Sequence, residues 1–309
     1  MLWVHPLHGY RYKMKEIRLQ TDEVITEYTI AEMKAKGANK FMGWTCTVGV
    51  ECLYIDFDGM VWRGPCRVGG PLGHMLTDWQ LPDTLAKCTR QTCDCGTGIK
   101  LVKSSPTQRV DPIEEQVFNV QWDLGRRCNY DCSYCWPSSH NKTDKWVPFK
   151  ALKLVVDKIG AQYDGNMQFN FAGGEPTLHP EFLEFCAYIR EKGHHIHVQT
   201  NGTMNVINAR KLANIAELSI SVHFEFVNYE KLINNIRAIL SAGNRLEIKM
   251  MVDSSNKSFF AALDFKRYLE TVPHIKIARV IMSPLRDPVT NDLMNYTEWQ
   301  RGHFGDVEF

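Results

Sequence analysis

The chain has 309 residues, of which 44% are hydrophobic and 23% are charged, and its formal net charge is +1 at pH 7. That length suits one large domain with a small satellite, and the near-neutral charge gives no polybasic signature for nucleic acid or a membrane surface. No apolar run approaches the roughly 20 residues of a membrane-spanning helix, and residues 1–15 lack the order of a signal peptide. We therefore expect a cytoplasmic protein with no membrane partner.

The first region, residues 1–105, is rich in Gly, Cys and Trp and has only short periodic segments. Segments 12–19 and 53–57 predict strands, and the Asp58-Gly59 dipeptide after the second predicts a hairpin turn. The polar segment 103–112 predicts a linker. We place the domain boundaries at 1–105 for an N-terminal module, 106–114 for the linker and 115–309 for a core domain.

After the linker, β-prone apolar runs alternate with helical patterns. The predicted strands are 116–122, 167–173, 195–200, 218–224, 246–252 and 275–281, and the predicted helices are 148–162, 180–192, 206–216, 229–242 and 258–271. This alternation is typical of a parallel α/β sheet or barrel. An eight-fold barrel needs about 250 residues, so we expect an open, partial (β/α)6 barrel of the TIM type with a small cysteine-rich α+β auxiliary domain. Chemistry in such folds gathers at the carboxyl ends of the strands.

The chain has ten cysteines, and most of them are clustered. Six fall between Cys46 and Cys95, three lie at positions 128, 132 and 135, and Cys186 stands alone in a helical pattern. Because a reducing cytoplasm disfavours structural disulfides, clustered thiols indicate metal ligation. Cys186 is predicted to be a small buried hydrophobic residue.

Cys128, Cys132 and Cys135 follow the first predicted strand of the core in one short loop. Three thiolates can hold three corners of a cubane iron–sulfur cluster and leave the fourth iron open to an external ligand, since such clusters usually have four cysteines. A structural zinc site, which commonly starts from a C-x2-4-C pair and closes with four ligands, is the alternative for these three thiols.

The Cys128-x3-Cys132-x2-Cys135 spacing, with Tyr134 before the third cysteine, resembles the signature of the radical S-adenosylmethionine (SAM) superfamily. The second predicted strand ends at residues 173–176, Gly173-Gly174-Glu175-Pro176, which resembles the motif that contacts the amino group of SAM in this family. Two consecutive glycines also let a backbone approach a ligand closely.

The next two strand ends extend the resemblance. The third ends in Thr200 and Asn201, similar to endings in the family. The fourth carries Ser221, His223 and Glu225 among apolar residues, where the family commonly contacts the ribose or carboxylate of SAM. Two alternatives stay open at this point: His223 as a hydrogen-bonded core residue, and Tyr134 as a packing residue rather than a neighbour of the adenine.

The resemblance implies a 4Fe-4S cluster that binds SAM, a one-electron reduction by a flavodoxin- or ferredoxin-type donor, and a 5′-deoxyadenosyl radical that abstracts hydrogen from a substrate. The cofactors supply the difficult chemistry, while the barrel positions the reacting carbon and excludes water and oxygen. A peptide or protein side chain is our first expectation for the substrate. A nucleoside, nucleotide or nucleic-acid base is the second, although the net charge does not favour a polymer bound through its phosphates. A non-catalytic iron–sulfur or zinc scaffold is the alternative outside enzymes.

The N-terminal cysteines resemble a SPASM or twitch module, which holds an auxiliary iron–sulfur cluster. We expect Cys46, Cys66, Cys93 and Cys95 to be ligands, with Cys88 in reserve. Cys52 is set aside because it falls in a strand pattern. A zinc knuckle built from the same thiols stays open, since four thiolates suit either metal.

This module precedes the barrel, whereas in the resembling enzymes it follows the barrel, and the spacing from Gly59 to Cys66 is longer than usual. We therefore expect a circular permutation, which is tolerable where chain termini lie close together on the surface. It predicts residues 1–105 over the mouth of the barrel and Met1 near Phe309. A rearranged or incomplete reading frame is the alternative.

Overall fold

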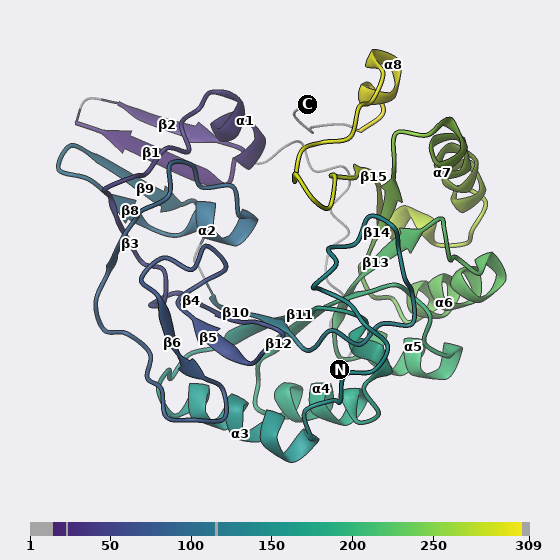
Figure 1. Cartoon of the computed structure of the whole chain (residues 1–309), viewed down its shortest axis with the longest axis horizontal. Coiled ribbons are helices and arrows are strands. Elements are labelled where there is room, and N and C mark those ends of the chain that lie inside the picture. The colour runs from purple at the N-terminus through teal and green to yellow at the C-terminus, as the bar shows by residue number, and fades with distance from the viewer. Residues whose placement is uncertain (1–14, 23, 115–116, 305–309) are drawn as a thin grey trace.

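The structure is a computed structural model that describes residues 15–22, 24–114 and 117–304. Within these residues the strands form a nine-stranded sheet and a separate six-stranded sheet. The larger sheet curves strongly, with helices along its outer face, and the smaller one lies at the upper left of the view (Figure 1). None of the helices described is both long and apolar enough to cross a bilayer.

Six neighbouring strands of the larger sheet run parallel. They are β10 (Phe118–Asp123), β11 (Met167–Ala172), β12 (His195–Thr200), β13 (Glu217–His223), β14 (Leu246–Val252) and β15 (Ala278–Pro284). Parallel neighbours need crossover connections, and these are α3 (Phe149–Gly160), α4 (Phe182–Glu191), α5 (Val206–Ala213), α6 (Tyr229–Ser241) and α7 (Asn256–Leu269). The prediction of an α/β fold with a parallel sheet is confirmed, and its curvature is consistent with a partial barrel.

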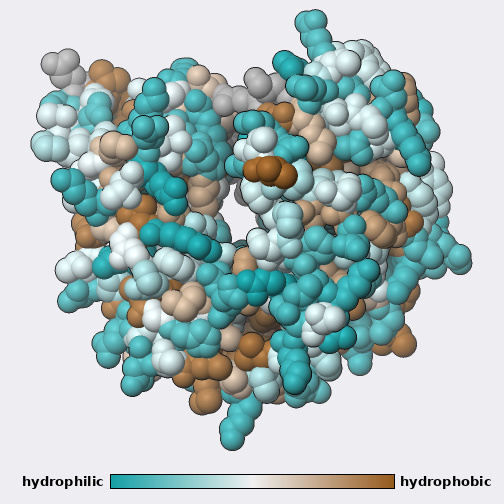
Figure 2. Space-filling model, in the orientation of Figure 1, coloured by the Kyte–Doolittle hydropathy of each residue, from teal (hydrophilic) through white to brown (hydrophobic). Residues whose placement is uncertain are grey.

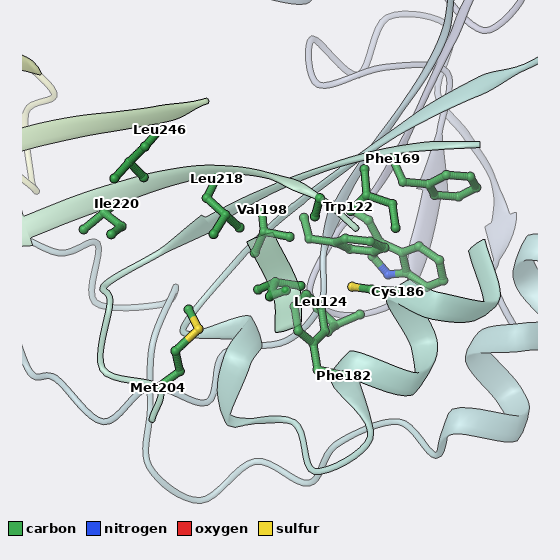
Figure 3. Packing of buried hydrophobic residues seen from close by; sticks show 14 of the residues in the cluster. Trp122, Leu124, Phe169, Phe182, Cys186, Val198, Met204, Leu218, Ile220 and Leu246 are labelled. Carbon is green, nitrogen blue, oxygen red and sulfur yellow. The ribbon is translucent and has the colours of Figure 1, made fainter. Parts of the chain in front are cut away.

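The main core lies between this sheet and its helices. In β10, Phe118, Val120 and Trp122 are buried and alternate with half-buried polar residues, so one face of the strand packs against helices. Figure 3 shows Trp122 beside Phe182 and Cys186 of the helix side. Cys186 is fully buried, which confirms its prediction as a small core residue.

Three strands of the N-terminal region extend the larger sheet. β4 (Cys52–Ile55) pairs in parallel with β10, and β5 (Met60–Trp62) and β6 (Pro71–His74) follow as antiparallel neighbours. The hairpin predicted at Asp58-Gly59 joins β4 to β5, where Gly59 has a φ of 77°. Residues 52–74 therefore share a sheet with the core domain, and the pairing of β4 with β10, such as Cys52 with Asn119, joins segments too far apart in sequence for local patterns to reveal.

The smaller sheet has the order β2-β1-β9-β8-β3-β7. Its strands are β1 (Ile17–Thr21), β2 (Ile25–Tyr28), β3 (Thr45–Cys46), β7 (Ala86–Lys87), β8 (Lys103–Ser104) and β9 (Gln108–Pro112), and α1 (Ile30–Ala35) and α2 (Gly96–Lys100) accompany them. We predicted a linker over 103–112 and set its boundaries at 106–114, but this segment contains β8 and β9. The two strands pair with each other, and they also pair with the distant strands β3 and β1.

The chain after α7 is less regular than predicted. The expected strand 275–281 begins only at Ala278, because Ile275–Ile277 form a 3-10 turn, η2, after His274 in the left-handed region. A second 3-10 turn, η1 (Pro176–Leu178), follows β11, and α8 (Glu298–Arg301) is a short helix near the end. The predicted proximity of Met1 and Phe309 lies outside the described residues.

Candidate active site at the cysteine loop

The three cysteines lie in the loop that connects β10 to α3, at the carboxyl end of the parallel strands. The loop is closed on itself: Asn141 N–H donates to Arg126 O at 2.8 Å, and Cys128 N–H donates to Asn141 O at 2.8 Å. Within it, Cys135 N–H donates to Cys132 O at 3.0 Å. The thiols are thus held at the end of the sheet where α/β folds place their chemistry, as predicted.

A cavity of about 500 Å³ opens beside this loop, and we call it the cysteine-loop cavity. Ten of the twelve residues predicted to bind the cluster or SAM line it: Cys128, Cys132, Tyr134, Cys135, Gly173, Gly174, Thr200, Asn201, Ser221 and His223. These residues come from one loop and three strand ends that are far apart in sequence. The prediction that they share a site is supported by this placement.

The two glycines after β11 are required by the backbone of the cysteine loop. A Cβ on Gly174 would lie 2.3 Å from Arg127 O, and Gly173 has a φ of 90° with Gly125 O only 2.7 Å from the place of its Cβ. Gly174 N–H also donates to Gly125 O at 2.8 Å. The glycine pair therefore seats the start of the cysteine loop against the end of β11.

Glu175 and Pro176 do not line the cavity. Glu175 is 1% exposed, and its carboxylate accepts hydrogen bonds from Thr200 Oγ1 at 2.7 Å and from Asn201 N–H at 2.5 Å. It also caps η1 by accepting from Thr177 N–H at 3.1 Å. In this structure Glu175 ties the end of β11 to the end of β12, a positioning role, rather than facing the cavity.

His223, at the end of β13, contacts the cysteine loop from the opposite side. His223 Nδ1 lies 2.9 Å from the Tyr134 hydroxyl and 3.5 Å from Cys132 Sγ. The rings of His223 and Tyr134 stack with their centroids 5.9 Å apart. Burial lowers the pKa of His223 to about 4, so the ring is neutral at pH 7. Tyr134 is thus packed against His223 within the cavity wall.

Glu225 was expected near SAM, and in the structure it binds the cysteine loop itself. It accepts a hydrogen bond from Ser133 N–H at 2.8 Å, and its other oxygen contacts the Ser133 hydroxyl. On the far side, Asn201 Nδ2 donates to Asn129 Oδ1 at 2.9 Å. The loop that carries the thiols is therefore clamped at Asn129 and Ser133 by the ends of two different strands.

The donor set fits an iron–sulfur cluster with SAM beside it. Burial raises the pKa of the Cys128 and Cys132 thiols, so a bound metal group is what would stabilise them as thiolates. Ser221 Oγ is buried on the cavity wall without a hydrogen-bond partner, as a hydroxyl meant for a ligand would be. Among the described residues, no three His, Cys, Asp or Glu side chains are grouped as ligands of a single metal ion.

Some cavity residues were missed by the sequence interpretation. Asp123, the last residue of β10, lies in the wall and accepts a hydrogen bond from the Tyr54 hydroxyl at 2.6 Å. Its place at a strand end was a usable signal. Arg286 also lines the cavity, and it lies just past the end of β15.

A second cavity, of about 760 Å³, is lined by Cys46, Cys66, Cys88, Cys93 and Cys95, and we call it the N-terminal cysteine cavity. All five are free thiols. Cys52, which was set aside, points elsewhere, with its Sγ 3.3 Å from Arg63 O. The structure thus brings all five candidates to one cavity, while Cys52 packs in the same buried cluster as Cys46 and Cys66 without lining that cavity.

Lys103 is buried beside these thiols, with only 2% of its surface exposed. Its ammonium donates to Leu101 O at 2.9 Å and also to Gly98 O, so it satisfies carbonyls at the end of α2. The charge of Lys103 lowers the pKa of Cys46 and Cys93, although burial outweighs it and the net pKa of both thiols is raised. A fixed cation here suits an anionic thiolate cluster.

Comparisons with known proteins find similarities to the core domain. The model of the Radical SAM superfamily matches residues 122–251. The Fe-coproporphyrin III synthase of Methanosarcina barkeri is 33% identical over 86 residues, 28% of this chain and 21% of that protein. The S-adenosylmethionine-dependent nucleotide dehydratase of Selenomonas ruminantium is 29% identical over 136 residues, 40% of this chain and 47% of that protein. The chain therefore matches less than half the length of these curated relatives.

A GTP 3′,8-cyclase of Actinobacillus succinogenes is 27% identical over 128 residues, 39% of this chain and 38% of that protein. The solved structure of Streptococcus suis SuiB bound to S-adenosylmethionine has a TM-score of 0.47 at 14% identity, over 59% of this chain and 44% of that one. The residues matched by the Radical SAM model, 122–251, include the cysteine loop and the strand ends of β11, β12 and β13 that line the cavity beside it.

Proposed function

We propose that Cys128, Cys132 and Cys135 hold a 4Fe-4S cluster in the cysteine-loop cavity and that SAM binds beside it. When bound, these groups supply a 5′-deoxyadenosyl radical by one-electron reduction of SAM, and that radical abstracts hydrogen from the substrate. The observation that carries this proposal is the convergence of three thiols and the unpartnered Ser221 hydroxyl on one cavity. A reduced flavodoxin or ferredoxin is the expected electron donor.

The protein's own residues position the reactants. Gly173, Thr200 and Asn201 form one wall of the cavity, and Ser221 and His223 form another, so SAM would lie between the ends of β11, β12 and β13. Tyr134 and His223 form a stacked pair in the cavity wall next to Cys132. This enclosure restricts water around the reacting groups.

For the N-terminal cysteine cavity we propose an auxiliary iron–sulfur cluster held by four of its five cysteines. The five thiols and the buried Lys103 cation support this assignment. The module over residues 1–105 would then act as the auxiliary-cluster unit of a rearranged radical SAM enzyme. A zinc ion held by the same thiols is the competing assignment.

The substrate class has two candidates. A peptide or protein side chain is the first, because the cysteine-rich module resembles modules of peptide-modifying radical SAM enzymes. A nucleotide is the second, and the names of the GTP 3′,8-cyclase and nucleotide dehydratase relatives favour it.

The test is anaerobic reconstitution with iron and sulfide, followed by dithionite and SAM. We expect 5′-deoxyadenosine from the wild-type chain, its loss in Cys128→Ala, and its retention in Cys186→Ala, which removes a thiol in the helix core. Iron should fall from roughly eight atoms per chain to roughly four in Cys128→Ala if both clusters form. Bound zinc without SAM cleavage in the wild-type chain would contradict the proposal.

A further inference from the structure

A third cavity, of about 440 Å³, lies on the inner face of the curved sheet, and we call it the lumen cavity. Asp123 and Gln199 line both this cavity and the cysteine-loop cavity, so the two share a wall. The lumen cavity has the size of a small-molecule site. In the space-filling view the molecule is hollowed near its centre, with hydrophilic and hydrophobic residues around the opening (Figure 2).

The lumen cavity has an unusually polar wall for a barrel interior, where branched apolar side chains normally dominate. Gln121, Asn170 and Gln199 present amides, and His197 adds an imidazole whose Nε2 lies 3.0 Å from the Ser219 hydroxyl. Burial lowers the pKa of His197, so its ring is neutral at pH 7. Such a wall matches a ligand that carries several hydrogen-bonding groups.

The N-terminal region completes the wall with Tyr54, Pro65 and Arg67. Among the described residues that line the cavity, Arg67 is the one with a permanent positive charge. Its guanidinium contacts Asp56 Oδ2 at 3.4 Å and lies 4.6 Å from the centre of the Trp62 ring. Arg67 is also a side-chain hydrogen-bond partner of Tyr54. These two partners leave several of the five N–H donors of an arginine unused.

Asp56 does not depend on Arg67 for its hydrogen bonds. Its carboxylate accepts from Asp58 N–H at 3.1 Å, Met60 N–H at 3.0 Å and Trp62 Nε1–H at 2.9 Å. Arg67 can therefore turn part of its guanidinium to a ligand without leaving the Asp56 carboxylate unsatisfied. Its fork of donors matches the two oxygens of a carboxylate or phosphate.

Arg67 also has a φ of 57°, in the left-handed region that long side chains seldom adopt. It closes the turn that starts at Gly64, to whose carbonyl its N–H donates at 2.9 Å. Glycine would take this conformation without strain. An arginine held there is consistent with a role for its side chain, since strained positions concentrate at functional sites.

We propose that the lumen cavity binds the reacting part of the substrate and that an oxyanion of that part, a carboxylate or a phosphate, is held by Arg67. The reacting end then lies at the shared wall of Asp123 and Gln199, next to the cysteine-loop cavity. At that end the described wall residues offer the acidic Asp123, whose Oδ2 accepts from the Tyr54 hydroxyl, and no cation, which favours placing the oxyanion at the Arg67 end. This inference rests on the proposed function and names the substrate class of that site.

The test is calorimetric titration of the reconstituted protein with two pairs of probes, in the presence of SAM and without reductant. Guanosine 5′-monophosphate is compared with guanosine, and N-acetylglutamate amide with N-acetylglutamine amide, so that each pair differs in its oxyanion. We expect the charged member of at least one pair to bind more tightly, and the pair that responds shows whether the oxyanion is a phosphate or a carboxylate.

Arg67→Gly should weaken that binding by about tenfold or more, as expected for loss of a charge-assisted hydrogen bond, and should leave the chain folded because glycine fits the turn. Arg67→Lys should retain part of the affinity. The matched control is His274→Gly, which relaxes another left-handed residue, φ 62°, outside the three cavities and should bind like the wild type.

Equal binding within both pairs, or equal affinity in the wild type and Arg67→Gly, would overturn the inference. Failure of both charged probes to bind would overturn it as well. Because these titrations involve no SAM cleavage, their failure is distinct from failure of the proposed function, which is the absence of 5′-deoxyadenosine from the wild-type chain.

Discussion

Glu175 at the end of β11 accepts a hydrogen bond of 2.5 Å from the backbone N–H of Asn201 at the end of β12. Asn201 in turn donates to Asn129 in the cysteine loop at 2.9 Å. A buried carboxylate thus links two strand ends and, through Asn201, the loop that carries the thiols. This linkage explains how a side chain that does not face the cavity can still determine its shape.

The first prediction follows from that bond. Glu175→Gln places a second N–H donor opposite the Asn201 N–H, inside a fully buried site, and should lower the free energy of unfolding by about 1–3 kcal/mol. Urea unfolding of the metal-free chain measures the change. Glu184→Gln, on the exposed side of α4, is the control and should unfold like the wild type. Equal midpoints for the two variants would contradict the positioning role of Glu175.

The contact of Gly174 with the cysteine loop leads to a second prediction. Gly174→Ala puts a methyl group 2.3 Å from Arg127 O, so the start of the loop must move. We expect destabilisation of about 1–3 kcal/mol and a loss of roughly four iron atoms on reconstitution. Gly160→Ala is the matched control because its Cβ meets nothing within 4 Å, and it should keep its iron. Full iron content in Gly174→Ala would show that the loop tolerates the shift.

A third prediction concerns Lys103. Lys103→Met keeps the apolar stem but leaves the carbonyls of Gly98 and Leu101 without their buried donor, which should destabilise the chain by about 1–3 kcal/mol. It also removes the cation beside Cys46 and Cys93, so the iron of the N-terminal cysteine cavity should be lost while the cluster at Cys128 remains. Iron analysis and unfolding of the variant test this, with the exposed Lys87→Met as control. Unchanged iron content would show that the Lys103 charge is not needed for metal binding in the N-terminal cysteine cavity.

Glu247, on the inner face of β14, allows a prediction about pH. Burial acts to raise its pKa, but hydrogen bonds from Lys249 and Ser219 and the charges of Lys249 and Arg279 outweigh burial, and the net pKa is below its ordinary value of 4.5. A carboxyl group with a lowered pKa in the folded state stabilises the fold above its unfolded pKa, and that stabilisation is lost as pH falls through the folded pKa.

We therefore expect Glu247→Gln to be less stable than the wild type at pH 7, with a difference that shrinks below about pH 4. Urea unfolding of the metal-free chain at both pH values measures it. Glu191→Gln, an exposed position, should show no such dependence. A difference that stays constant down to acidic pH would mean that Glu247 is not stabilised by its cationic neighbours.

Much of the core was predictable because its signals are local. The apolar runs of β12 and β14 were predicted with the bounds that the structure shows, since each strand is a short apolar segment between helical patterns. The same holds for the cysteine loop, whose spacing is visible in eight consecutive residues. Its neighbours Thr200 and Ser221 could be placed at one site because parallel strands end at one edge of a sheet.

Other features depended on pairings between distant segments. Hairpin β8–β9 was taken for a linker because each strand is too short to show a period, and its partners lie far away in the chain. Glu175 was predicted to face SAM, but the fold turns it toward Asn201, since a motif defines residue types and spacing but not the direction of a buried side chain. Arg67 and Arg286 belong to no recognisable motif. The tertiary fold alone places them at the cavities, because it brings distant segments of the chain together.

The amino-acid sequence by itself determined the strand–helix alternation, the thiol triplet and the clustering of five further cysteines, because these depend on composition and on spacings of a few residues. Only the tertiary structure decided that β4 joins the barrel sheet beside β10, that Lys103 is buried among the N-terminal thiols, and that Arg67 reaches the lumen cavity. Those outcomes arise from the packing of segments tens of residues apart, where burial and backbone pairing select one arrangement that no local pattern encodes.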